Sequence, residues 1–147
     1  MSTVWLIGAG RMAIAYAKVL KALGRDVQAI GRSEAGAAAF TAETGAPCRA
    51  GGLPADLAEI GGPAQGAIVA VNVDQLAATS RRLIDGGVRR LLIEKPAGVD
   101  PAEIEELAAA AAARGVEAYV AYNRRFYASV DATRQAIEED GGVTSVT

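Results

Sequence analysis

Short apolar segments alternate with longer amphipathic segments along the whole chain. Six of the short segments are predicted to be strands, because they are bounded by glycine, proline or polar residues and have the length of buried strands. The predicted strands are Val4–Ile7, Val27–Ile30, Pro47–Arg49, Ala67–Val71, Arg90–Ile93 and Ala118–Ala121. The run at 67–71 is apolar throughout, which is typical of a strand buried on both faces of a sheet.

Helical periodicity fills the intervals between these strands. The clearest start is Asp100-Pro101-Ala102-Glu103, in which a capping aspartate precedes a first-turn proline and a glutamate that reaches back. The predicted helices are Arg11–Leu23, Glu34–Thr44 with a cap at Ser33, a short one in Leu53–Ile60, one capped by Asn72 or Asp74, one that opens at Asp100-Pro101 and is carried by six alanines to Arg114-Gly115, and Phe126–Glu139. Inward faces are predicted for Met12, Tyr16, Val19, Leu20 and Leu23, and for Leu76, Ala77, Ser80, Leu83 and Ile84.

The alternation of strands and helices predicts a doubly wound α/β fold of the Rossmann type, with about six parallel strands. In this fold the first and fourth strands are neighbours, and ligands bind at the carboxyl ends of the strands. Residues 1–140 are expected to form this domain. Residues 141–147 begin an alternating pattern, which we interpret as the start of a second domain or as a strand that pairs with another chain, for example in a homo-oligomer.

Composition excludes several classes of function. The 15 basic residues are dispersed and the net charge is −2, so nucleic acid is not an expected partner. The absence of histidine excludes histidine-based metal sites and Ser-His-Asp catalysis, and no metal is expected. The single cysteine, Cys48, is expected to be an inert, buried thiol. No apolar run approaches the ~20 residues of a membrane span, and no signal peptide is evident, so a cytoplasmic protein is expected.

The most informative segment is Gly8-Ala9-Gly10-Arg11-Met12-Ala13, a Gly-x-Gly-x-x-Ala turn between a strand and a helix. Gly8 permits a tight turn, Gly10 leaves room for a pyrophosphate, and Ala13 lets the helix approach the strand. Backbone N–H groups and the helix dipole favour a phosphate there. A structural glycine turn without a ligand is the alternative, and the flanking strand and helix favour dinucleotide binding.

The end of the second predicted strand bears on the choice of cofactor. An acidic residue there would bind a ribose 2′-hydroxyl, whereas this chain has Arg32 and Ser33. An arginine pairs with phosphate or stacks on adenine, which favours NADP over NAD, although NAD stays possible. The alternative is that Arg32 is solvated and Ser33 only caps its helix.

Two further loops carry candidate chemistry. Glu94-Lys95-Pro96 follows the fifth predicted strand, where the Lys95 ammonium can donate a hydrogen bond to a substrate oxygen or exchange a proton. A surface lysine is the alternative. Tyr122-Asn123-Arg124-Arg125-Phe126 follows the sixth strand, where Asn123 is a candidate for a cofactor amide or ribose and Arg124 for an anionic or polyhydroxy ligand.

In this order and at these separations, the three segments resemble the Gfo/Idh/MocA family, the group of glucose–fructose oxidoreductase and inositol dehydrogenase. The resemblance implies a pyridine-nucleotide oxidoreductase that acts on sugars, cyclitols or related alcohols, with Lys95 as catalytic lysine and a candidate cis bond before Pro96. The family's usual Thr-Pro pair and histidine are replaced by Val71-Asn72-Val73 and Gln75-Leu76. The family's second domain, which supplies the substrate pocket, is not represented, so we expect this chain alone to be inactive.

The resulting hypothesis is hydride transfer between a nicotinamide cofactor and a sugar-like alcohol or carbonyl. A non-catalytic nucleotide-binding or structural module is the alternative. The candidate cofactor-binding residues are Gly8, Gly10, Arg11, Met12, Ala13, Arg32, Ser33, Val71, Asn72, Glu94, Pro96, Asn123 and Arg124, and Lys95 is the candidate catalytic residue.

Overall fold

Six parallel strands form a single sheet in the order β3-β2-β1-β4-β5-β6. The strands are β1 (Val4–Ile7), β2 (Val27–Ile30), β3 (Cys48–Arg49), β4 (Gly66–Val69), β5 (Arg90–Ile93) and β6 (Glu117–Val120). The computed structural model describes residues 3–143 and 145. The predicted doubly wound fold is confirmed, with β1 paired to both β2 and β4. The reversal of strand order between β1 and β4 places the candidate site at the carboxyl end of this pair.

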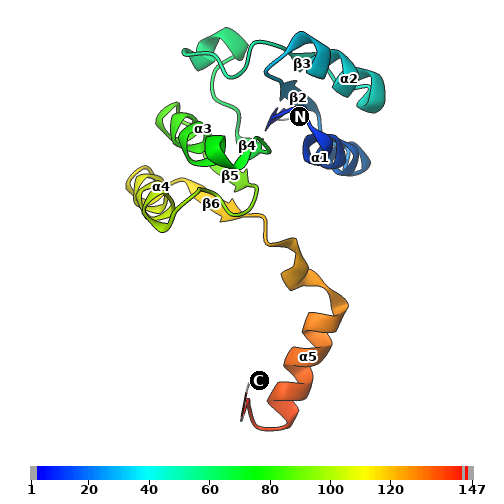
Figure 1. Cartoon of the computed structure of the whole chain (residues 1–147), viewed down its shortest axis with the longest axis vertical. Coiled ribbons are helices and arrows are strands. Elements are labelled where there is room, and N and C mark those ends of the chain that lie inside the picture. Colours follow the sequence, from blue (N-terminus) through cyan, green and yellow to red (C-terminus); the bar gives the residue numbers. More distant parts are fainter. Residues whose placement is uncertain (1–2, 144, 146–147) are drawn as a thin grey trace.

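Helices cover both faces of the sheet (Figure 1). The helices are α1 (Arg11–Ala22), α2 (Glu34–Thr44), α3 (Val73–Asp85), α4 (Pro101–Ala113) and α5 (Ala128–Glu139), with 3₁₀ turns at Leu57–Ile60 and Asn123–Phe126. Helices α1 and α2 pack together on one face, and α3 and α4 on the other. The last helix, α5, extends away from the sheet and packs against the 3₁₀ turn that precedes it (Figure 1).

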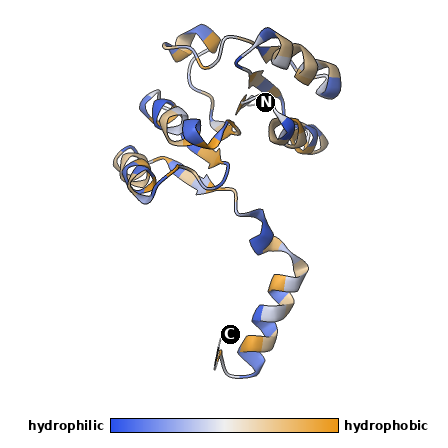
Figure 2. Cartoon of the chain, in the orientation of Figure 1, coloured by the Kyte–Doolittle hydropathy of each residue, from blue (hydrophilic) through white to orange (hydrophobic). Residues whose placement is uncertain are grey.

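The core is split by the sheet into two apolar layers. Because successive strand residues point to opposite faces, Leu6 packs with Phe40 on the α1–α2 side, while Trp5 and Ile7 face α3 and α4. Figure 2 shows the apolar residues concentrated on the central strands and the hydrophilic ones on outward helix faces. Burial of this kind is the dominant favourable contribution to folding, and it holds the carboxyl ends of the strands in place.

The inward face predicted for the first helix is wrong for three of its five residues and confirmed for Tyr16 and Leu20, which pack against the core. Met12, Val19 and Leu23 are exposed, and Tyr16 and Leu20 are half-buried. The buried positions of α1 are Ala13 and Ala17. Short side chains let α1 lie close to the sheet, so the fully buried positions of this helix accommodate only small residues. The inward face of α3 is confirmed, since Leu76, Ser80, Leu83 and Ile84 are buried and Ala77 is half-buried.

Several boundaries differ from the prediction. Only the last four residues of Leu53–Ile60 are helical, as a 3₁₀ turn, and β6 begins and ends one residue early. The predicted helix Phe126–Glu139 begins two residues late, at Ala128, because Phe126 closes the preceding 3₁₀ turn. The alternating pattern of 143–147 falls mostly outside the described residues.

Candidate functional site

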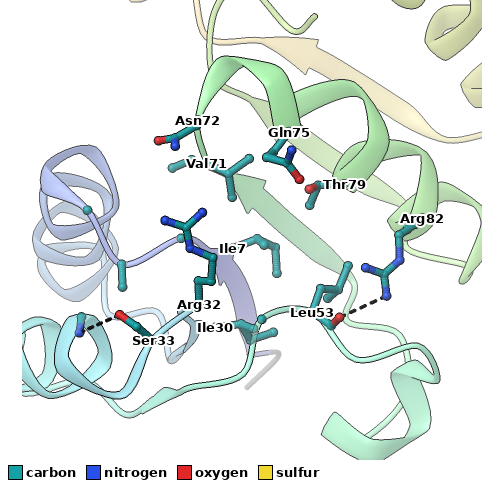
Figure 3. A pocket seen from close by; sticks show the side chains of 16 residues that line it. Ile7, Ile30, Arg32, Ser33, Leu53, Val71, Asn72, Gln75, Thr79 and Arg82 are labelled. Atoms are coloured by element: carbon teal, nitrogen blue, oxygen red, sulfur yellow. Dashed lines mark hydrogen bonds between the residues drawn. The ribbon is translucent and has the colours of Figure 1, made fainter.

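A cavity of about 510 Å³ opens at the carboxyl ends of β1, β2 and β4 (Figure 3). Its position is the one where open α/β sheets bind ligands, because the loops after β1 and β4 diverge to opposite faces there. The predicted residues that line it are Gly8, Gly10, Arg32, Ser33, Val71 and Asn72. The structure therefore brings together three loops that are separated in the sequence by 20 to 40 residues each.

The two glycines of the first loop have different surroundings. Gly8 has φ +125°, and a Cβ built on it would lie 2.2 Å from the carbonyl oxygen of Ala70. Gly10 is the N-cap of α1, and a Cβ there would meet nothing within 4 Å. Gly8 is thus required by packing, whereas Gly10 keeps the cavity open beside the N–H groups of α1 that have no partner within the helix.

Three residues of the predicted phosphate turn, Arg11, Met12 and Ala13, do not line the cavity. Ala13 is fully buried beneath α1, where its small side chain serves the contact between helix and sheet. Arg11 and Met12 are exposed in the first turn of α1. Their backbone N–H groups at the helix start have no partner within the helix and can donate to a phosphate.

Arg32 and Ser33 follow β2 and face the cavity. The Arg32 side chain extends across the cavity toward Val71 and Asn72 (Figure 3). Ser33 caps α2, since its Oγ accepts a hydrogen bond of 3.2 Å from the N–H of Gly36. Among the described lining residues there are two arginines, Arg32 and Arg82, and no carboxylate, so the cavity as a whole favours a negatively charged group.

Helix α3 and the loop after β3 supply lining residues that sequence reasoning missed. Arg82 donates two hydrogen bonds to this loop, at 3.1 Å to the Leu53 carbonyl and 2.6 Å to the Pro54 carbonyl. At its other end the loop is tied to β2 by a 2.8 Å bond from the N–H of Gly52 to the carbonyl of Gly31. The missed lining residues are Ala9, Ile30, Gly36, Gly52, Leu53, Gln75, Thr79 and Arg82, with Ile7 and Ala70 from the strand ends. The sequence signal that could have indicated the α3 residues is the helical spacing of the polar side chains Gln75, Thr79 and Arg82.

The Glu94-Lys95-Pro96 turn follows β5, next to the strand that borders the cavity. The Lys95–Pro96 bond is cis, as the family resemblance implied. The N–H of Glu94 donates to the Val69 carbonyl at 2.9 Å, and the Glu94 carbonyl accepts from the N–H of Ala97 at 3.0 Å. Lys95 and Pro96 are exposed and do not line the cavity.

Tyr16 connects this turn to α1. Its hydroxyl donates a hydrogen bond of 2.5 Å to Oε1 of Glu94, although 78 positions separate the two residues. Burial raises the pKa of the Tyr16 phenol far above its ordinary value, and the hydrogen bond and negative charge of Glu94 add to this effect. The phenol therefore remains protonated, and the Glu94 carboxylate, predicted as a cofactor contact, is directed at α1.

The remaining candidates lie outside the cavity. Asn123 and Arg124 are exposed in the 3₁₀ turn after β6, where the guanidinium of Arg125 lies 5.7 Å from the centre of the Phe126 ring. Cys48 is half-buried, and burial raises the pKa of its thiol against a smaller opposing hydrogen bond from Gly31. In the described part of the chain, no three or more acidic, histidine or cysteine side chains gather as metal ligands, and no helix is long and apolar enough to cross a bilayer.

Comparison with known folds gives structures that match almost all of this chain. The WlbA dehydrogenase from Chromobacterium violaceum, in complex with NADH and UDP-GlcNAcA, has a TM-score of 0.83 at 20% identity over 94% of this chain and 40% of that one. A putative myo-inositol dehydrogenase from Sinorhizobium meliloti has a TM-score of 0.78 at 23% identity over 95% and 41%. Biliverdin reductase from Synechocystis, with biliverdin and NADP⁺, has a TM-score of 0.76 at 21% identity over 93% and 43%.

These likenesses establish the fold, and the chain spans about two fifths of the length of each of these structures. No curated protein matches the sequence. The family model described as an oxidoreductase family with an NAD-binding Rossmann fold matches residues 3–122, which is most of the chain and includes every loop around the cavity. The chain therefore belongs to the Gfo/Idh/MocA family of oxidoreductases, whose matched region is an NAD-binding Rossmann domain.

Proposed function

We propose that the chain binds NADP(H) in the cavity at the β1–β4 switch point, as the nucleotide half of an oxidoreductase acting on a sugar, a cyclitol or a related alcohol or carbonyl. The observation that carries the proposal is the cavity lining itself. Gly10 leaves the start of α1 open, and the other side of the cavity presents two arginines without a carboxylate.

The cavity suits a dinucleotide in both its shape and its charge. A side chain at Gly10 would occupy the space through which a pyrophosphate reaches the N–H groups of α1, and the structure leaves that space empty of protein atoms. Ser33 and the start of α2 lie beside Arg32 and add a hydroxyl and the positive end of a helix dipole. The capping bond from Gly36 uses one lone pair of the hydroxyl oxygen and leaves its proton available as a donor.

The preference for NADP follows from the charge at the end of β2. A ribose 2′-phosphate carries close to two negative charges, which an arginine stabilises through paired N–H donors. An acidic residue in that position would repel it, and Glu34 is the nearest carboxylate in sequence but does not line the cavity. Relatives of this fold have been solved with NADH and with NADP⁺, so the fold accommodates either cofactor.

Isothermal titration calorimetry with NADP and NAD tests the proposal. We expect NADP to bind more tightly, and Arg32→Ala to weaken NADP binding by about ten- to one-hundredfold while it changes NAD binding far less, as expected for hydrogen bonds to a charged group. Arg89→Ala, an exposed arginine outside the cavity, is the matched control. Equal losses for both nucleotides in Arg32→Ala, or no binding of either by the parent chain, would refute the assignment.

Lys95 is proposed as the residue that orients the substrate oxygen and relays its proton. The nicotinamide cofactor, when bound, supplies or accepts the hydride. Lys95 stands at the carboxyl end of β5, at the same edge of the sheet as the cavity, and its exposure lets the ammonium reach a substrate that lies above this edge. The sugar nucleotide in the WlbA complex supports the sugar-like class of substrate.

A non-catalytic role is the second candidate, favoured by the exposed aromatic side chains that lead into α5. Tyr122, Phe126 and Tyr127 are all exposed, and such residues are frequent in protein interfaces. Nucleotide binding without turnover against a panel of polyols supports a binding module or a chain that needs a further domain. Turnover by this chain alone would contradict that candidate.

A further inference from the structure

The carboxylate of Glu94 has two potential partners of different chemistry, Tyr16 and Lys95. Lys95 follows Glu94 directly, so its ammonium is the nearest cation in the sequence to the Glu94 carboxylate. The structure instead directs the carboxylate to α1, where the half-buried Tyr16 hydroxyl donates to it at 2.5 Å. Within the described residues, Lys95 has no carboxylate at ion-pair distance, whereas Lys18 pairs with Glu43 at 2.8 Å.

The sheet offers Glu94 no competing cation. The register that pairs Val69, Ile93 and Val120 continues to Ala70 on the β4 side and Ala121 on the β6 side, and both are uncharged. Among the described residues, Tyr16 is the side chain that hydrogen-bonds Glu94. The backbone of the turn is separately fixed by bonds from Glu94 to Val69 and from Ala97 to Glu94, so the phenol controls the direction of the carboxylate and not the path of the chain.

We infer that Tyr16 is a positioning residue that holds the Glu94 carboxylate against α1 and so keeps the Lys95 ammonium available to a substrate oxygen. An ammonium that is paired with a neighbouring carboxylate is a poorer partner for a ligand, because the ion pair must be broken first. The inference deepens the proposed function, since it rests on Lys95 as the residue that contacts substrate. Burial and the charge of Glu94, which raise the pKa of Tyr16, keep the phenol protonated and able to donate throughout the physiological range.

The sequence makes this inference directly measurable, because it contains three lysines, Lys18, Lys21 and Lys95. Acetylation by an N-hydroxysuccinimide ester of acetic acid, read out by peptide mass spectrometry, reports the reactivity of each one. Lys18 is an internal reference for a paired lysine, and Lys21 is a reference for an exposed one. Tyr122→Phe is the matched control, because it removes the same hydroxyl from an exposed tyrosine.

We expect Lys95 in the parent chain to react faster than Lys18. In Tyr16→Phe the released carboxylate pairs with Lys95, and its labelling rate falls by about two- to fivefold, the range for an exposed ion pair of up to ~1 kcal/mol. The double variant Tyr16→Phe/Glu94→Gln restores the parent rate, because no carboxylate remains. Lys18 and Lys21 stay unchanged in all variants, and Tyr122→Phe leaves all three rates as they are.

An unchanged Lys95 rate in Tyr16→Phe, an equal fall at Lys21, or a failure of Glu94→Gln to restore the rate would overturn the inference. If Tyr16→Phe does not fold, Glu94→Gln provides the test: absorbance titration at alkaline pH should show Tyr16 ionising at lower pH than in the parent, and no downward shift would overturn the inference, because the contact on which it rests would be absent. No nucleotide enters these measurements, so a failed NADP titration and a failed labelling experiment point to different errors.

Discussion

The glycines of the first loop provide the sharpest test of how the site is built, because the structure gives them separate tasks. At Gly8, alanine would place its Cβ 2.2 Å from the Ala70 oxygen and 2.9 Å from the Ala70 carbonyl carbon, at a φ of +125°. That backbone region costs of order 1–3 kcal/mol for a residue with a side chain, and overpacking adds about 1–3 kcal/mol. The Ala70 carbonyl cannot move away easily, since the Ala70 N–H is bonded to Ile7 at 2.8 Å.

We therefore expect Gly8→Ala to lower the free energy of unfolding by about 2–6 kcal/mol, out of a typical 5–15 kcal/mol for a domain. Gly10→Ala differs in both respects. Its backbone is in the ordinary extended region, and nothing lies within 4 Å of the new Cβ, so the stability loss is that of a poorer N-cap, below about 1 kcal/mol. The methyl group would instead stand where the pyrophosphate approaches, and NADP affinity should fall at least tenfold, or about 1.4 kcal/mol.

Urea unfolding followed by the fluorescence of Trp5, the single tryptophan and a buried one, measures the first quantity, and calorimetry with NADP measures the second. The reasoning fails if Gly8→Ala unfolds at the parent urea concentration, or if Gly10→Ala binds NADP as tightly as the parent chain. An equally large loss of stability in Gly10→Ala and Gly8→Ala would also contradict the reasoning, because Gly10 would then be required for packing as Gly8 is.

Two further predictions concern stability. The pKa of Tyr16 is higher in the folded chain than in the unfolded one, so its contribution to stability is fully present below about pH 10 and declines as the pH rises beyond that value. Between pH 8 and pH 11, the urea midpoint of the parent should therefore fall more steeply than that of Tyr16→Phe. Asp100 caps α4 by accepting a 3.0 Å bond from the N–H of Glu103, so Asp100→Ala should cost about 1 kcal/mol in urea unfolding, whereas Asp100→Asn should cost clearly less.

Sequence reasoning succeeded where the signal is local. The bounds of α2 and the start of α4 match the prediction, because each helix starts after a residue whose side chain caps it, Ser33 and Asp100. The bounds of β1, β2 and β5 match because polar or glycine residues interrupt the apolar runs at both ends. The order of the strands was also predictable, since a chain of alternating strands and helices has few ways to cover both faces of a sheet.

Predictions from the sequence were wrong where the packing of neighbouring elements, and not the local pattern of apolar residues, determines the structure. The fully buried positions of α1 are Ala13 and Ala17, because the helix lies close to the sheet, and of the larger residues predicted to face inward only Tyr16 and Leu20 pack against this layer. Helix α5 starts two residues later than predicted, because the chain first completes the 3₁₀ turn Asn123–Phe126. In both cases the decisive quantity is the distance to a neighbouring element, which a single sequence does not contain.

The candidate site divides in the same way. Six predicted residues line the cavity because the adjacency of β1 and β4 determines which loops meet, and this adjacency follows from the fold class. The wall formed by Leu53 and Arg82 was missed because it depends on how the loop after β3 returns over β2, through left-handed glycines at 51 and 52. A basic side chain 29 positions away on α3 then fixes that loop, and no local pattern indicates such a contact.

The strand order places the residue proposed to bind the cofactor, Arg32, far from the residue proposed to contact substrate, Lys95. Arg32 follows β2 and Lys95 follows β5, and the order β2-β1-β4-β5 places three strand spacings, about 14 Å, between them. Because the two residues start from strands so far apart, we expect them to contact different parts of the nucleotide, so Lys95→Met should leave the NADP affinity within about twofold of the parent while Arg32→Ala weakens it (2-fold being ~0.4 kcal/mol). Calorimetry on the two variants side by side makes the comparison. An equal loss of NADP affinity in Lys95→Met would mean that the nucleotide lies along β5. It would refute an arrangement with the 2′-phosphate at β2 and the nicotinamide near β5.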